Sequence, residues 1–392
     1  MKDNSVQFAV KACRTIMDRY NPRDLPPKEC FFYHQGVFLS GMERLYDLTR
    51  KKEYFNYIQD YADYVLGPCG EVYGFCHELG LRQGSRFAGR EMTMLDCRQP
   101  AVLLYRLFDE TGDEKYMNAA RTISASLYYW PVNEYGGYWH MLTQPNQMWL
   151  DSVYMCGPLS VKYAKRFGDT TLRKRAVKQV LLIDEKMKDI QTGLYYHGWD
   201  PTKTAEWANK KTGLSECIWG RAVGWYAAAI VDMLDDIPEN LPEYKLLADI
   251  EAALLKALTA YQDYKNGLWY QVTDKPGEAG NWIETSSSCL FAYAYAKAIR
   301  KGLIPREQYI SVLNKVFDGI QDYIYEDAEG RLTLDRICIG TCIESGLYEH
   351  YIQRNHKKND LHGMGAFVLM CTETAKLNAQ YGSEKAADDA EN

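Results

Sequence analysis

Hydrophobic residues recur along most of the chain at three- and four-residue spacing, which is the periodicity of an amphipathic helix. One such stripe consists of Cys97, Ala101, Leu104 and Phe108, which fall on one helical face. No segment shows the sustained two-residue alternation expected of a long strand. The pattern therefore predicts twelve helices, over residues 4–20, 34–50, 52–66, 95–110, 113–127, 150–167, 169–190, 217–235, 241–263, 285–301, 305–323 and 362–378.

Short segments in which a glycine turn is joined to aromatic or apolar residues recur between these helices. They begin at Gly74, Gly137, Gly193, Gly267 and Gly330, an interval of about one sixth of the chain. Twelve helices with this period predict an all-α toroid of six helical hairpins, with β-like segments lining a funnel at one end. An open α-solenoid, whose common repeats are roughly 34–47 residues long, fits the period less well.

The hairpins are expected to form one domain, and no linker interrupts them. Residues 1–381 are predicted to be that domain, and residues 382–392, which are small, polar and acidic, to be a frayed tail. Among 392 residues, 46% are hydrophobic and 25% charged, as in a soluble globular protein with a substantial core. The 31 Tyr and 9 Trp residues are many, and both side chains suit packing as well as a sugar-binding cleft.

Charge and cysteine content narrow the possible partners and location. The net charge of −6 argues against nucleic acid or an anionic membrane as the main partner. No segment reaches the roughly eighteen apolar residues needed to span a membrane, and the N-terminal apolar run, broken by Lys11, is not a signal peptide. Eleven cysteines, an odd number without a CxxC pair, indicate reduced thiols in a cytoplasmic protein and no zinc site.

The segment 136–155, GGYWHMLTQPNQMWLDSVYM, concentrates chemistry around one carboxyl group. Asp151 follows Trp149 and lies in the same segment as Trp139 and His140, just where a helix is predicted to begin. An isolated Asp at such a position is most often a helix cap. Neighbouring indoles, however, can exclude water and raise the pKa of a carboxyl group toward the range useful for proton transfer.

A second acid and two histidines occupy comparable positions. Asp96, like Asp151, follows an aliphatic residue at a predicted helix start, so it is either a cap or a partner across the funnel. Two acids that meet there would raise each other's proton affinity. His140 and His197 each follow an aromatic pair after a glycine turn, and this equivalence favours a role in a site over a structural one. Metal binding is not expected, because neither has further ligands at close spacing.

The segment 215–230 places Trp219, Arg221 and Trp225 within two helical turns. Arg221 could stack on the indoles as a structural cation–π contact. A guanidinium group flanked by indoles also suits a sugar carboxylate, and this second interpretation is favoured. Residues 33–35 and 282–284 are weaker candidates for the funnel rim, and residues 359–363 are interpreted only as a helix cap.

Four motifs, at residues 136–155, 215–226, 281–302 and 359–367, together carry a resemblance to a known family. In this order, and over about residues 30–378, the chain resembles glycoside hydrolase family 105, the unsaturated rhamnogalacturonyl hydrolases. The resemblance implies an (α/α)6 barrel, in agreement with six hairpins. It also implies removal of a terminal 4,5-unsaturated uronic acid from oligosaccharides that polysaccharide lyases leave, with Δ-galacturonyl-rhamnose as the expected substrate and no cofactor.

By the same resemblance, Asp151 is the general acid and base, and Asp96 is the second acid that positions and tunes it. The residues implied to surround the unsaturated ring are His140, His197, Trp219, Arg221, Trp225 and, as a looser match, Tyr33.

Two features depart from the family pattern, and several functions stay open. Met141 follows His140 where family members often have Lys, and the loop 205–212, with Trp207, has no assignable role beyond covering a saccharide or its own loop. The same chemistry could act on unsaturated glucuronyl oligosaccharides from ulvan, arabinogalactan or glycosaminoglycans. The pattern is also compatible with a sugar epimerase using His140 and His197 as opposed bases, or with a non-catalytic saccharide-binding toroid. Nothing in the sequence indicates an oligomeric state.

Overall fold

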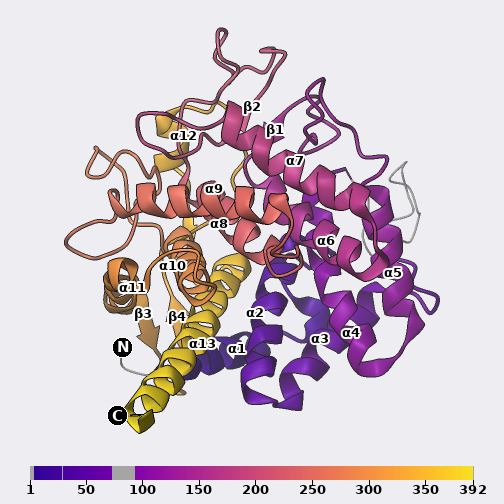
Figure 1. Ribbon diagram of the computed structural model, residues 1–392, viewed down its shortest axis with the longest axis vertical. Helices are drawn as coiled ribbons and strands as arrows, with labels where there is room; N and C mark the ends of the chain where they lie inside the picture. Colours follow the sequence, from indigo (N-terminus) through magenta and orange to yellow (C-terminus); the bar gives the residue numbers. More distant parts are fainter. Residues whose placement is uncertain (1–3, 29, 73–92, 392) are drawn as a thin grey trace.

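A computed structural model describes residues 4–28, 30–72 and 93–391, and its architecture is a closed double ring of helices (Figure 1). The inner ring consists of α2 (Tyr33–Thr49), α4 (Val102–Thr111), α6 (Ser152–Phe167), α8 (Gly220–Met233), α10 (Thr285–Arg300) and α13 (Leu361–Glu391). The outer ring consists of α1 (Ser5–Arg19), α3 (Lys52–Val65), α5 (Glu114–Ser126), α7 (Thr170–Lys186), α9 (Pro242–Thr259) and α11 (Arg306–Ile320). Each inner helix contacts the next one, and α13 closes the ring against α2. The predicted (α/α)6 barrel is confirmed.

The sixth hairpin joins the two ends of the chain. Helix α1 packs against α13, whereas α2 pairs with α3 and the remaining hairpins follow in order. Figure 1 shows the first helix lying beside the last. Closure of the ring therefore depends on a contact between segments at opposite ends of the sequence.

Three local differences from the predicted helices have clear causes. The predicted helix 95–110 begins instead with two 3₁₀ turns, η2 (Leu95–Cys97) and η3 (Gln99–Ala101), because Pro100 lacks the N–H that a continuous α-helix would require. Helix α12 (Tyr348–Ile352) is too short to produce a periodic signal. Where the sequence predicts a frayed tail from residue 382, α13 continues to residue 391 through a stretch that contains several helix-forming Ala and Glu residues. Two further short 3₁₀ turns, η1 (Pro22–Asp24) and η4 (Gln321–Tyr323), flank outer-ring helices.

Of the predicted β-like segments, those that begin at Gly193 and Gly330 each contain a strand, whereas those at Gly137 and Gly267 contain isolated antiparallel bridges. The strands form three antiparallel pairs. These pairs are β1 (Met148–Trp149) with β2 (Gly198–Trp199), β3 (Ile324–Glu326) with β4 (Leu332–Leu334), and β5 (Ile337–Cys338) with β6 (His356–Lys357). The recurring turns need glycine, since Gly193, Gly267 and Gly330 have φ values of 74°, 73° and 74°. The first predicted repeat, at Gly74, lies outside the described residues.

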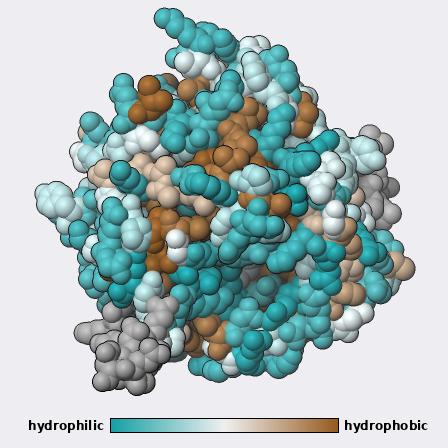
Figure 2. Space-filling model, in the orientation of Figure 1, coloured by the Kyte–Doolittle hydropathy of each residue, from teal (hydrophilic) through white to brown (hydrophobic). Residues whose placement is uncertain are grey.

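The core fills the space between and within the two rings. Almost all of α8 and α10 is buried, because inner helices contact both the barrel axis and the outer ring. The face of the molecule in Figure 2 is largely hydrophilic, with hydrophobic residues showing between polar ones. In the described part of the chain, no helix combines the length and apolar character required to cross a membrane.

Candidate active site

The inner helices begin at one end of the barrel, and five of the predicted site residues lie at or near these helix starts. Tyr33 opens α2, Asp96 lies in η2 just before α4, and Asp151 is the residue before α6. Trp219 and Arg221 occupy the start of α8. The positive ends of the helix dipoles therefore surround this site, which favours a negatively charged ligand.

Asp151 occupies a cap position without using its carboxylate as a cap. Its side chain accepts no hydrogen bond from the first turn of α6. Instead, Oδ2 lies 3.1 Å from Nε2 of His197, and the residue is 7% exposed. By contrast, the carboxylate of Asp169 accepts from two backbone N–H groups of α7. Capping therefore explains Asp169 but does not explain Asp151.

Asp96 faces the other predicted histidine. Its Oδ1 lies 3.4 Å from Nε2 of His140, whose Nδ1 is 3.0 Å from the Ser152 hydroxyl oxygen. The backbone N–H of Leu95 donates to the His140 carbonyl oxygen at 3.0 Å, which fixes η2 against the glycine-turn segment. The structure thus brings both acids and both imidazoles together, as the sequence predicted.

The two carboxyl groups differ in proton affinity. Burial, followed by the nearby charge of Asp151, raises the pKa of Asp96 well above its ordinary value. Burial also acts upward on the pKa of Asp151, but the imidazoles of His197 and His140 outweigh it, so the pKa is lowered. Burial lowers the pKa of His140 to about 4, so this ring is neutral near pH 7. The predicted rise in pKa is wrong for Asp151 and occurs instead at Asp96.

Several buried polar atoms at the site lack a well-aligned hydrogen-bond partner among the described residues. They include Oδ1 of Asp96, Oδ2 of Asp151 and Nε2 of His197. Buried polar groups are nearly always satisfied, and exceptions call for an explanation such as a ligand or water. These three atoms belong to the two facing pairs, Asp96 with His140 and Asp151 with His197. Their lack of partners indicates that a polar ligand binds between these residues.

Aromatic rings form the walls and floor around the acids. Trp149 stacks on His140 with centroids 4.3 Å apart, and Trp219 lies 4.7 Å from the His197 ring. Trp225 lies deeper, 1% exposed, and packs edge-on against Tyr33 at 6.1 Å. Trp225 is thus a floor residue that supports Tyr33.

Tyr33 lies among the charges of the site. Burial raises the pKa of its hydroxyl well above the ordinary value; Arg221 opposes this shift, and Asp96, Asp360 and Asp151 add to it. The hydroxyl therefore stays protonated, and it is placed where it can act as a hydrogen-bond donor or acceptor beside the acid pair.

Arg221 is completely buried, and its guanidinium group has protein partners. Nη1 donates to the Cys338 carbonyl and to Nε2 of His362, and Nη2 donates to the Ile339 carbonyl at 2.6 Å. The guanidinium carbon lies 4.6 Å from the centre of the Trp219 ring. These contacts fix Nη1 and Nη2 structurally, as a cation–π interpretation requires. Nε is buried without a hydrogen-bond partner among the described residues, so binding of a sugar carboxylate stays a prediction.

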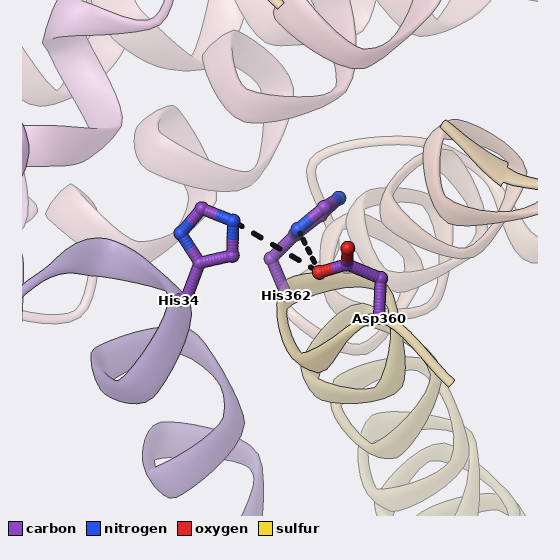
Figure 3. Close-up of side chains that lie close together, drawn as sticks. All are labelled: His34, Asp360 and His362. Atoms are coloured by element: carbon purple, nitrogen blue, oxygen red, sulfur yellow. Dashed lines mark ion pairs between the residues drawn. The ribbon is translucent and has the colours of Figure 1, made fainter. Parts of the chain in front are cut away.

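Beside Arg221, two residues that sequence reasoning interpreted only as part of a helix cap, Asp360 and His362, form a cluster with the rim candidate His34. His34, Asp360 and His362 place one potential metal-binding atom each within 4.8 Å of one another (Figure 3). His362 is buried, and burial and Arg221 lower its pKa. Nε2 lies 2.8 Å from Nη1 of Arg221 and 3.1 Å from the Cys338 carbonyl oxygen, and Nδ1 lies 3.0 Å from Oδ1 of Asp360. The contacts of His362 with Arg221 and Asp360 make the cluster a polar support for Arg221.

We expect a chelator to leave the enzymatic rate unchanged. The reason is that the guanidinium group of Arg221 lies 2.8 Å from Nε2 of His362, and its positive charge disfavours a cation in the cluster. The measurement is the initial rate after dialysis against EDTA, with metal content determined in parallel. A loss of activity that one divalent cation restores would contradict this account of the cluster.

The funnel mouth carries a small apolar cluster of its own. Met141, Trp149 and Ile343 pack together, with Met94 and Trp207 at the edge. Met141, which follows His140 in the sequence, thus presents an uncharged side chain at the mouth, and this residue is 9% exposed.

The loop that contains Trp207 packs against the segment after β5. A side chain added at Gly346 would meet the Cβ atom of Trp207 at 3.0 Å. Asp200 fixes the start of the loop, because its Oδ2 accepts from the backbone N–H of Ala205 at 2.8 Å. The structure therefore shows Trp207 covering the segment around Ile343 in addition to its own loop.

The fold and the site define a class of protein, the glycoside hydrolases built on an (α/α)6 barrel. The chain belongs to Glycosyl Hydrolase Family 88, whose family model matches residues 8–378. It is 24% identical to the unsaturated rhamnogalacturonyl hydrolase YesR of Bacillus subtilis, over 94% of this chain and 96% of that protein. It is also 24% identical to the unsaturated 3S-rhamnoglycuronyl hydrolase of Formosa agariphila, over 58% of each. A solved glycoside hydrolase from family 105 of C. acetobutylicum superposes with a TM-score of 0.85 at 29% identity, covering 93% of this chain and 98% of that one. The predicted resemblance to family 105 is confirmed, and the chain is a glycoside hydrolase of the unsaturated uronyl type.

Proposed function

We propose that the enzyme hydrates the 4,5 double bond of a terminal unsaturated uronic acid, with Δ-galacturonyl-rhamnose units from rhamnogalacturonan as substrate. The observation that carries the proposal is the pair of buried acids, each facing a different imidazole and displaced in opposite directions in pKa. Such a pair holds one proton jointly, and it has both an acidic and a basic member near neutral pH.

Asp151 is the proposed proton donor and acceptor in the reaction. The uronate carboxylate brings a negative charge into the site, which raises the proton affinity of the acids and favours a protonated Asp151. Asp151 then transfers its proton to C4 of the enol ether, and positive charge develops at C5 and the ring oxygen. Its carboxylate next removes a proton from a water molecule whose oxygen bonds to C5. The hemiketal opens, and the C1 oxygen leaves with the aglycone sugar as the unsaturated residue becomes a keto-uronate.

The surrounding residues have roles that follow from their contacts. Asp96 keeps a proton in the free site and adjusts the charge that Asp151 experiences. The rings of Trp149 and Trp219 enclose the imidazoles and exclude water. Arg221, held by backbone carbonyls through Nη1 and Nη2, contributes positive charge at the site, and its Nε–H has no partner among the described residues. The dipoles of the inner helices add to the attraction for a uronate.

The identity of the sugar is the finer part of the proposal. The similarity to an unsaturated rhamnogalacturonyl hydrolase over nearly the whole chain supports a rhamnogalacturonan product. The similarity to an unsaturated 3S-rhamnoglycuronyl hydrolase supports a glucuronyl substrate as the second candidate. The neutral mouth around Met141 favours an aglycone without a negative charge there. The cysteines of the described residues are thiols rather than disulfides, which supports a reducing, cytoplasmic location.

Two functions of a different kind have less support. An epimerase would need His140 and His197 on opposite faces of a sugar as bases, yet each imidazole faces a carboxylate and is held from behind by a hydroxyl group. A non-catalytic binding protein would not require acids with oppositely displaced pKa values.

The test is a direct assay with lyase-generated unsaturated disaccharides. We expect the ultraviolet absorbance of the enol ether to disappear, fastest with the Δ-galacturonyl-rhamnose product and more slowly with ulvan or glycosaminoglycan products. The reason is that hydration at C5 destroys the conjugated double bond. Absence of turnover on all three classes of product would overturn the proposed function, and conversion of the sugar without absorbance loss would indicate an epimerase.

A further inference from the structure

A buried tyrosine hydroxyl lies directly behind the imidazole that faces Asp151. Tyr351, in α12, is completely buried, and its Oη lies 2.7 Å from Nδ1 of His197. Its ring lies 5.7 Å from the imidazole and 6.2 Å from the Trp219 ring. The contact connects residues 154 positions apart in the sequence, so it exists only in the folded barrel.

Helix α12 is held in place by contacts that do not involve this hydroxyl. Nε2 of Gln271 donates to the Tyr351 carbonyl oxygen at 3.1 Å, and Nε1 of Trp282 donates to the Ile352 carbonyl at 3.2 Å. The same Gln271 accepts from Nε1 of Trp219 at 3.1 Å, which ties α12 to the wall of the site. Removing only the hydroxyl group should therefore leave the helix in position.

The hydroxyl proton of Tyr351 is directed toward the imidazole of His197. Burial raises the pKa of Tyr351 well above the ordinary value, so the phenol stays protonated. Nδ1 of His197 is the hydrogen-bond partner that the described residues provide for this hydroxyl. A hydroxyl that donates to Nδ1 needs a lone pair on that nitrogen, so the imidazole proton is then on Nε2. On the other side of the ring, Nε2 lies 3.1 Å from Oδ2 of Asp151.

We propose that Tyr351 is a positioning residue that holds His197 in the Nε2–H tautomer and so presents an N–H donor to Asp151 and to the substrate space. This role rests on the proposed function, in which Asp151 must return to its ionised form within each turnover. An N–H group beside Oδ2 stabilises that form, whereas a lone pair on Nε2 would oppose it. The N–H is not fully aligned with Oδ2, so it also has capacity to bond a substrate oxygen.

The tautomer can be measured without any substrate. In protein labelled with ¹⁵N-histidine, long-range ¹H–¹⁵N spectra distinguish a protonated from an unprotonated ring nitrogen, and His197→Gln assigns the signals. We expect unprotonated Nδ1 and protonated Nε2 in the wild type at neutral pH. In Tyr351→Phe we expect the Nδ1 signal to move toward a tautomer mixture, because its donor is gone.

The matched control is Tyr348→Phe, on the same short helix. The hydroxyl of Tyr348 is exposed to solvent and donates to the Ala279 carbonyl at 3.2 Å, away from His197. We expect this variant to retain the wild-type histidine spectrum and rate. Tyr351→Phe should lower kcat about tenfold, the effect of one buried hydrogen bond, with a smaller change in KM.

The possible results distinguish a failure of this proposal from a failure of the proposed function. An Nδ1–H tautomer in the wild type, or unchanged His197 signals in Tyr351→Phe, would overturn the role of Tyr351 whatever the enzyme hydrolyses. If Tyr351→Phe does not fold, the wild-type spectrum still decides the tautomer. A wild-type enzyme inactive on unsaturated oligosaccharides would instead overturn the proposed function and leave the tautomer measurement valid.

Discussion

Replacing Asp151 by Asn is expected to reduce the hydrolysis rate by at least about a hundredfold, the lower range for loss of a proton-transfer group. Asn keeps the size and much of the polarity of the side chain, but it can neither deliver a proton to C4 nor take one from water. The measurement is kcat from the loss of enol-ether absorbance, with the unfolding midpoint recorded for the same sample. Turnover at the wild-type rate would remove Asp151 from the mechanism.

Asp169 provides the matched control, because it occupies the same kind of helix-start position. Its carboxylate caps α7, whereas that of Asp151 faces His197. Asp169→Ala should therefore lower the free energy of unfolding by about 1 kcal/mol and leave kcat unchanged. Asp151→Asn should show the reverse, with the rate lost and the stability retained. A shared effect of both variants on stability would return Asp151 to a capping role.

The acid pair shows what a local motif can and cannot predict. Asp151 and His140 are close in sequence, and the recurring glycine turns predict that His197 occupies an equivalent loop, so their meeting could be inferred. The direction of the Asp151 pKa shift could not, since it depends on how closely two imidazoles approach the carboxylate. Indole neighbours alone pointed the other way, because burial without a charged or hydrogen-bonding partner raises the pKa of an acid.

The site residues that the sequence analysis missed lie in segments of two kinds. Their sequence pattern is either too short to be recognised or has a more common explanation. Tyr351 lies in a five-residue helix without a periodic pattern, and its partner His197 is distant in sequence. Asp360 and His362 stand at the start of α13, where a cap is the usual explanation for a polar residue. Only closure of the ring brings His362 to Arg221, so no local pattern indicates that this predicted substrate ligand is also anchored from within the fold.

The fold itself was more predictable than the site, for a physical reason. Helical periodicity and positive-φ glycines act locally, so the helices and the repeat appear directly in the sequence. The pairing of α1 with α13 carries no local signal, since it results from the requirement that the last inner helix bury its remaining face. The Pro100 interruption before α4 is also local, and it moves Asp96 into a 3₁₀ turn beside His140.

The largest effect on stability is expected at the opposite end of the inner helices, where Lys297 is completely buried on α10. Its ammonium group forms ion pairs with Asp232, at 2.5 Å, and with Asp235. Lys297→Met keeps the length of the side chain but leaves two acids without their main partner. We expect the free energy of unfolding to fall by about 3 kcal/mol, the lower range for breaking a buried pair, because Arg44 still contacts Asp232. Urea unfolding measures this value.

The pH dependence of that loss identifies its electrostatic origin. Burial acts upward on the pKa values of Asp232 and Asp235, but Lys297 and Arg44 outweigh it and lower both. A carboxyl group with a lowered pKa in the folded state stabilises the fold above its unfolded pKa of about 3.9, and this contribution disappears as the pH falls below that value. The wild type should therefore lose stability in acid, and the difference in stability between wild type and Lys297→Met should shrink there.

Lys301→Met, which removes a more peripheral partner of Asp235, should lower the free energy of unfolding by less than about 1 kcal/mol at neutral pH. A difference between wild type and Lys297→Met that persists unchanged in acid would assign the effect to packing of the Lys297 side chain instead of its charge.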